Sequence, residues 1–144
     1  MKNNLIYILI FLCFSCSGCC FGSLTLGMSF NVDEKYRNYI GVRVAPKIFP
    51  AAILSNGRNI EPYIHMPYNM PYGKFKAMVP EGTIITIVHI IRAYGPDDGV
   101  YDSVKGSINV PGYNGLVVIG ICDGKKIPTL EQCIDLKEYE ILGK

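Results

Sequence analysis

Short apolar runs separated by Gly, Pro and Asn turns extend from about residue 40 to the end of the chain. β-Branched runs of this length, bounded by such turn residues, are typical of strands rather than helices. The strands expected on this basis are 40–44, 51–54, 61–66, 74–79, 83–94, 100–110, 116–122 and 139–142. Because Pro62 cannot donate to a ladder, we expect the strand over 61–66 to lie at an edge.

The longest apolar run, Thr83–Tyr94, predicts a central strand. Both of its faces are mostly apolar, as expected for a strand that is buried on both sides or that curls around a small barrel. His89 falls on an apolar face, where a core histidine with a satisfied ring is the simplest interpretation. The turn that follows predicts a hairpin with a solvated tip that carries Asp97, Asp98 and Asp102, rather than a calcium site.

One helical element is expected near the end of the chain. Thr129 and Gln132 have the spacing of a capping box, which predicts a short helical turn over residues 130–136. About eight strands with so little helix predict an all-β fold. The closing order of strand, helical turn and strand favours a single small barrel, SH3-like or OB-like, with a β-sandwich as the alternative.

The first 20 residues follow a different pattern. A short start with Lys2 leads into the apolar stretch Leu5–Phe14 and then into small residues, which is the layout of a secretory signal. The apolar stretch is shorter than the roughly 20 residues that a transmembrane helix needs. Ser17 and Gly18 before Cys19 resemble the lipobox of bacterial lipoproteins, in which the cysteine becomes diacylated and N-terminal, although Cys16 stands where that family prefers Leu.

This resemblance covers residues 1–20 alone and implies a division of the chain into three parts. Residues 1–18 are the signal peptide, 19–38 the lipidated cysteine and its tether, and 39–144 the β domain. The protein is then anchored to a membrane of the bacterial cell envelope by acyl chains and faces the periplasm or the surface. Cys16 and Cys20 are competing acceptors for the lipid, and an ordinary cleaved signal peptide is the alternative interpretation.

The cysteines have two further interpretations. Cys13, Cys16 and Cys19 have the spacing of an iron–sulfur run, but they lack the polar loop that wraps such a cluster. Cys122 and Cys133 lie in the β domain, and an oxidising envelope compartment permits a disulfide between them. Two buried thiols are the alternative for this pair.

Charge and motifs exclude several classes of function. The chain has 14 basic and 12 acidic residues, and a net charge of +2 gives no reason to expect nucleic acid as a partner. No Ser–His–Asp set, phosphate-binding glycine loop or zinc motif is visible, so neither an enzyme nor a cofactor is predicted. A small hydrolase whose titratable groups converge only on folding remains an alternative.

The segment Pro62–Gly73, PYIHMPYNMPYG, is the most unusual part of the chain. Tyrosine is favoured at binding surfaces, and the candidate partner-binding residues are Tyr63, Tyr68 and Tyr72. Soft ligands for Cu(I) are also present, namely His65, Met66 and Met70, so copper handling is an alternative function. A third interpretation is a loop whose rings pack on the β domain. The sequence thus predicts an envelope binding module whose expected partner is another envelope protein. A toxin or hydrolase that the protein inhibits, as in an immunity-type role, and a cell-wall component are the alternative partners.

Overall fold

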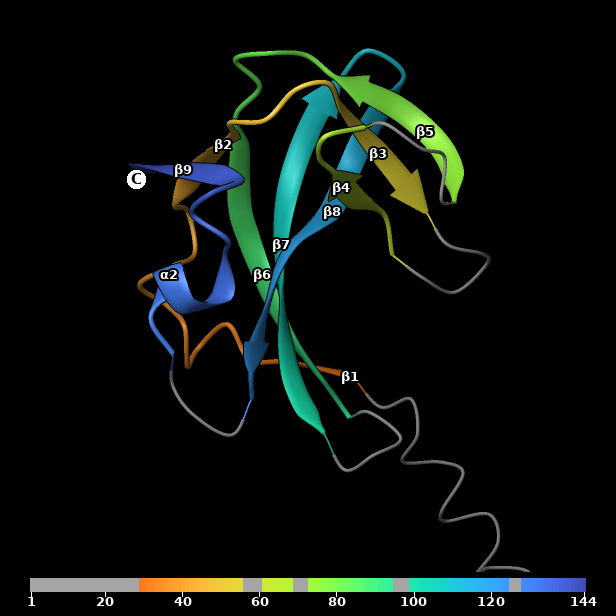
Figure 1. Ribbon diagram of the computed structural model, residues 1–144. Helices are drawn as coiled ribbons and strands as arrows, with labels where there is room; N and C mark the ends of the chain where they lie inside the picture. The colour runs from red at the N-terminus through yellow and green to blue at the C-terminus, as the bar shows by residue number, and fades with distance from the viewer. Residues whose placement is uncertain (1–28, 56–60, 69–72, 95–98, 125–127) are drawn as a thin grey trace, which may run out of the picture.

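The computed structural model describes residues 29–55, 61–68, 73–94, 99–124 and 128–144. Within these ranges the chain forms nine strands and one short helix (Figure 1). In chain order they are β1 (Ser29–Asn31), β2 (Arg43–Pro46), β3 (Ala51–Ser55), β4 (Tyr63–His65), β5 (Lys74–Val79), β6 (Ile85–Tyr94), β7 (Val100–Val110), β8 (Tyr113–Asp123), α2 (Leu130–Cys133) and β9 (Tyr139–Gly143). The predicted all-β class is confirmed.

The strands form a single sheet with the order β5-β3-β4-β8-β7-β6-β2-β9, and β1 pairs with β6. Among the described residues β5 and β9 are the two ends of this path, so the sheet is open rather than closed into the expected barrel. The long strands β6, β7 and β8 pair antiparallel and form its middle, while β3, β4 and β5 lie together at one end (Figure 1).

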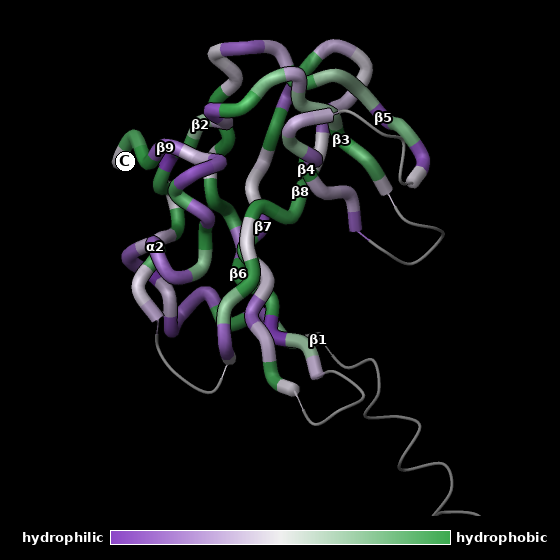
Figure 2. The backbone as a smooth tube through the Cα atoms, in the orientation of Figure 1, coloured by the Kyte–Doolittle hydropathy of each residue, from purple (hydrophilic) through white to green (hydrophobic). Residues whose placement is uncertain are grey.

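The sheet bends around one hydrophobic core. Residues from both halves of the strand order meet there, including Ile53 of β3, Ile87 of β6, Val104 of β7 and Ile119 of β8. The hydropathy colouring follows this arrangement, with hydrophobic residues along β3 and hydrophilic ones at the start of β5 (Figure 2). One face of the sheet therefore covers the core, and the opposite face, called the outer face below, points away from it.

β4 lies inside the sheet and not at its edge, contrary to the expectation drawn from Pro62. It is hydrogen-bonded to β3 on one side, and Tyr63 pairs in parallel with Val118 of β8 on the other. Pro62 takes part as an acceptor, because its carbonyl receives the Val118 N–H at 2.8 Å. A proline is compatible with an interior strand when it precedes the strand and contributes only its carbonyl.

A β-bulge in β6 changes which of its side chains point toward the core. The prediction that His89 lies in the core is therefore wrong. The pairing register of β6 with β7 shifts between Ile87 and His89, which leaves Val88 as the extra residue. One extra residue reverses which side chains point inward. Ile90 is consequently buried in place of His89, whose side chain is 46% exposed on the outer face.

Residues 29–38, assigned to the tether from sequence, include parts of the folded domain. β1 pairs with the end of β6, and Tyr36 is fully buried. A buried tyrosine within a polar segment is not visible as periodicity, because VDEKYRNY has no regular apolar spacing. The folded domain therefore takes in β1 and Tyr36 as well as the residues assigned to it from sequence.

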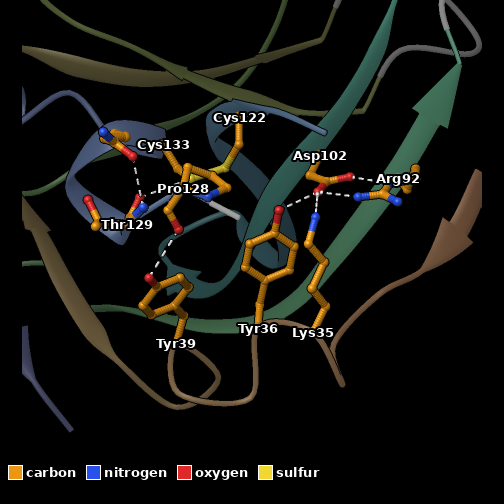
Figure 3. Close-up of a disulfide and its surroundings, with 10 residues drawn as sticks. Lys35, Tyr36, Tyr39, Arg92, Asp102, Cys122, Pro128, Thr129 and Cys133 are labelled. Atoms are coloured by element: carbon orange, nitrogen blue, oxygen red, sulfur yellow. Dashed lines mark hydrogen bonds and ion pairs between the residues drawn. A yellow bond between two sulfur atoms is a disulfide. The ribbon is translucent and has the colours of Figure 1, made fainter. Parts of the chain in front are cut away.

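The predicted disulfide between Cys122 and Cys133 is confirmed, with the two Cα atoms 4.6 Å apart (Figure 3). It joins β8 to α2, which is shorter than the helical turn expected from sequence. The predicted Gln132 contact is present, because its side chain accepts the Thr129 N–H at 3.0 Å. Gly120 permits the close approach, since a Cβ atom there would lie 2.1 Å from the Cys133 carbonyl oxygen.

Candidate binding surface

A continuous row of side chains crosses the outer face of the sheet. Each member is directly opposite the next on the neighbouring strand, and such pairs have Cβ atoms about 4.5–5.5 Å apart. The row is Phe75 (β5), Leu54 (β3), Tyr63 (β4), Val118 (β8), Lys105 (β7) and His89 (β6). It is aromatic at the β5 end and charged at the β6 end, so the two ends are suited to different chemistry.

At the aromatic end of this row, a patch of larger side chains surrounds Leu54 and Ala52, the two outer-face residues of β3. We call this patch the aromatic face, and its members are Tyr63, His65, Tyr68, Phe75 and Met78. Leu54 and Ala52 are fully buried although they do not belong to the core cluster. Larger neighbours therefore close over them, while Phe75 and Met78 remain 47% and 43% exposed.

Two of the three predicted partner-binding tyrosines belong to this face. Tyr63 is half-buried and lies opposite Leu54. Tyr68 is also half-buried, its ring lies 6.0 Å from the Phe75 ring, and its backbone N–H donates to the Pro50 carbonyl at 2.6 Å. The hydrogen bond holds the backbone of Tyr68 beside the sheet, and the ring packs against Phe75. Tyr72 lies outside the described residues.

Phe75 and Met78 were not identified from sequence. The alternation in KFKAMV places Phe75 on the same face as the buried Ala77 and Val79. A register shift between β3 and β5 moves it to the other face, because Ile53 pairs with Ala77 but Leu54 pairs with Phe75. A local sequence pattern contains no signal for this bulge, since it depends on the partner strand.

The residues considered for copper are not gathered as a surface site among the described residues. Met66 is 8% exposed and belongs to the hydrophobic core, so its sulfur is not presented to solvent. His65 lies on the outer face with its Nδ1 atom 3.1 Å from the Pro67 carbonyl oxygen. Met70 lies outside the described residues. Within those residues, no group of three His, Cys, Asp or Glu side chains forms a metal site.

A small hollow lies next to the aromatic face, between β4 and β8. Its volume is about 90 Å³, and its lining residues are Glu61, Pro62, Lys105, Leu116, Val117 and Val118. Lys105 forms an ion pair with Glu61 at this hollow. Pockets for drug-sized ligands have roughly 300–1,000 Å³, so a hollow of this size is better suited to one side chain of a larger partner.

A second cluster, around Asp102, is buried and structural (Figure 3). Asp102 was expected at a solvated hairpin tip, but it is fully buried. Arg92 donates to both of its carboxylate oxygens at 2.8 and 3.0 Å, and the Tyr36 hydroxyl donates to Oδ2. Lys35 Nζ lies 3.7 Å away. The cluster joins β6, β7 and the segment after β1, and it leaves the carboxylate no room for a substrate.

The electrostatics of this cluster follow from its contacts. Burial raises the pKa of Asp102, but hydrogen bonds from Arg92 and Tyr36 and the nearby positive charges outweigh it, so the pKa lies below its usual value. Burial and the Asp102 carboxylate raise the pKa of Tyr36. Within the described residues, no buried side-chain nitrogen or oxygen lacks a hydrogen-bond partner.

Asp33 and His89 form a third cluster, on the exposed end of the row. His89 Nδ1 donates to Asp33 Oδ2 at 2.9 Å, and Asp33 Oδ1 accepts the Ile90 N–H at 2.7 Å. Burial raises the pKa of Asp33, but the hydrogen bonds from His89, Ile90 and Asn31 lower it on balance. A carboxylate that orients a histidine is one part of a hydrolase triad. In the described part of the chain, however, no Ser, Thr or Cys side chain bonds this ring.

No family model, curated protein or solved structure matches this chain. In the described ranges, no helix is long and apolar enough to cross a membrane. Cys19, the predicted lipidation site, lies outside them.

Of the three clusters, the aromatic face alone combines large exposed rings with a neighbouring hollow, so it is the best candidate for a recognition surface.

Proposed function

We propose that the protein is a lipid-anchored envelope protein that binds a protein partner through its aromatic face. The observation that carries this proposal is the position of Tyr63, Tyr68 and Phe75 on the outer face, away from the core. Rings in this position are not needed to fill the core. In protein interfaces, a few large residues, many of them aromatic, supply most of the binding free energy. The anchor is supported by the resemblance of Ser17-Gly18-Cys19 to a lipobox.

Energetics favour a partner on this surface. Phe75 and Met78 are each a little under half exposed. Complete burial of such a side chain is worth about 1.5–3 kcal/mol, so covering what remains contributes about 1 kcal/mol for each. The main-chain bond from Tyr68 to Pro50 holds the backbone at this residue, and its ring already packs against Phe75, so part of the ordering that a partner would require is present in the free protein.

The double variant Tyr68→Ala/Phe75→Ala tests the recognition surface. We expect binding of the captured partner to weaken by about 2–4 kcal/mol, because two central rings are lost. The partner is first isolated by cross-linking in envelope preparations, and its affinity for each full-length variant is then measured in detergent. The matched control is Ile121→Ala/Leu142→Ala, which removes two exposed apolar residues from β8 and β9, away from the aromatic face and the hollow.

Circular dichroism separates a binding defect from a folding defect. If Tyr68→Ala/Phe75→Ala unfolds the domain, the rings are structural and the proposal fails. It also fails if the folded double variant binds like the wild type, or if Ile121→Ala/Leu142→Ala weakens binding to the same extent. Loss of binding in the folded aromatic variant alone is the outcome that the proposal requires.

Cys19→Ser tests the anchor. Without a thiol for diacylation, the protein is expected to leave the membrane fraction or to accumulate as an unprocessed precursor. Fractionation with mass spectrometry of the N-terminus measures both outcomes, and Cys16→Ser and Cys20→Ser are the matched controls. If Cys19→Ser fractionates and is processed like the wild type, the lipoprotein assignment is wrong, while the binding surface remains to be judged by its own variants.

A further inference from the structure

β5 ends the described sheet with an unpaired side. Its residues pair with β3 alone in the strand order. In an antiparallel strand at the end of a sheet, the N–H and C=O groups of every second residue point away from the neighbouring strand. The bulge at Lys76 interrupts this alternation once within β5. Such an edge is a template for another extended chain. The edge also borders the aromatic face, because β5 contributes Phe75 and Met78 to it.

The side chains on this edge specify which chain can pair with it. Lys74 and Lys76 are exposed on either side of Phe75, and in the described part of the chain neither forms an ion pair. Lysines commonly protect edge strands against association. Here the two lysines lie beside an exposed aromatic ring. Because of their positive charges, the edge repels a basic strand and attracts an acidic one.

Pairing of two β5 edges is unfavourable for the same reason. Pairing of two such edges around Phe75 would bring Lys74 and Lys76 of one copy close to the same lysines of the other, and like charges that face each other are destabilising. The other end of the sheet has different chemistry, because β9 carries Glu140 and no basic residue within its bounds. Among the strands that the structure describes, the combination of two exposed lysines with an exposed ring is therefore particular to the β5 edge.

We propose that the partner contributes an extended segment with alternating acidic residues, which adds to β5 as a further strand. Its backbone pairs with the free side of β5, its carboxylates pair with Lys74 and Lys76, and an apolar side chain lies on Phe75. This inference rests on the proposed binding function and specifies the chemistry of the partner. It describes β-strand addition, in which main-chain bonds supply affinity and side chains supply selectivity.

The experiment selects displayed random 12-residue peptides on the full-length protein, followed by synthesis of those that are enriched. We expect the enriched peptides to alternate Asp or Glu with apolar residues. Their affinity should fall about tenfold or more for Lys74→Glu/Lys76→Glu, which corresponds to about 1.4 kcal/mol. The matched control Lys137→Glu/Lys144→Glu has the same change in net charge and should bind within about twofold of the wild type.

Hydrogen exchange then tests the mode of binding. A selected acidic peptide should slow amide exchange over residues 74–79, because strand addition pairs donors that are otherwise free. If peptides require Tyr68 and Phe75 but bind equally well after the charge reversals, or leave exchange over 74–79 unchanged, strand addition is overturned while the proposed function stands. If no peptide is enriched over a surface without the protein, the inference is overturned as well.

A second copy of the chain is the competing occupant. β9 of one molecule could offer Glu140 to the β5 edge of another, which would give a head-to-tail assembly. Sedimentation of the full-length protein in detergent measures this directly. Association that grows with concentration and disappears in Lys74→Glu/Lys76→Glu would overturn the assignment of the edge to a different protein, whereas a single sedimenting species at all concentrations agrees with it.

Discussion

Replacing Asp102 with Asn is expected to lower the free energy of unfolding by about 3–5 kcal/mol. Asp102 is fully buried and accepts hydrogen bonds from Arg92 and Tyr36. The amide keeps the size of the side chain but removes the negative charge, which leaves the Arg92 guanidinium without its counter-ion. Loss of one partner of a buried pair is more damaging than its replacement by apolar groups, because the other charge remains buried.

Urea unfolding measured as a function of pH distinguishes the contribution of this charge to stability from that of packing. The pKa of Asp102 is lowered in the folded state, so its contribution to stability is fully present above the unfolded value of about 3.9. It is lost as the pH falls below that value through the lower folded pKa. The free energies of unfolding of the wild type and of Asp102→Asn should therefore differ most near neutral pH and become similar in acid.

The matched control for this prediction is Glu140→Gln, which neutralises an exposed carboxylate on β9. It should change stability by less than about 0.5 kcal/mol. If Asp102→Asn is as stable as the control, or if its stability difference from the wild type does not shrink in acid, the buried cluster does not hold the segment after β1 on the sheet. Tyr36 would then be held by packing alone.

Removal of the disulfide is the second large effect. Cys122→Ala/Cys133→Ala is expected to lower the free energy of unfolding by about 2–4 kcal/mol, because the bond closes a loop that the unfolded chain otherwise leaves free. The two residues are separated by eleven positions and join α2 to β8. Thermal unfolding of the wild type with and without reductant, beside the double variant, measures the contribution.

The reduced wild type should unfold near the temperature of the double variant, and the oxidised wild type clearly above both. Mass spectrometry without reduction should find the two cysteines linked in the purified protein. If the double variant is as stable as the oxidised wild type, the disulfide does not stabilise this end of the domain. In that case, packing of α2 against β8 at Gly120 holds the segment without help from the bond.

Much of the fold follows from local patterns. The turn at Pro111 and Gly112 separates two strands that were predicted from their β-branched runs, and Gly112 adopts the positive φ of +83° that such a turn requires. The disulfide was also predictable, because the two cysteines flank a segment with a helical capping signal. These features depend on residues that are close together in the chain.

The features missed from sequence depend on partner strands. The bulges in β5 and β6 reverse the faces of Phe75 and His89, and neither bulge has a local signature. The buried pair of Arg92 and Asp102 did have a signal, since these residues are directly opposite in the β6–β7 hairpin. Counting outward from the predicted turn would have placed the two opposite charges together.

The candidate surface was predicted in part. Tyr63 and Tyr68 were selected because tyrosine is favoured at binding surfaces and the segment around them is unusual, and both lie on the aromatic face. Their neighbours Phe75 and Met78 come from a different strand, so only the folded sheet brings the four together. Met66, which follows His65 in the chain, points instead into the core, because alternate residues of a strand face opposite sides.

Site-specific photo-cross-linking in cells tests the recognition surface most directly. A benzophenone amino acid replaces Phe75 in one full-length variant and Ile121 in another; both positions are exposed on the outer face, on β5 and β8 respectively. The proposed function predicts one discrete protein adduct from position 75 and little or none from position 121. An adduct from position 121 alone, or the same adducts from both positions, would contradict the assignment of the aromatic face as the recognition surface.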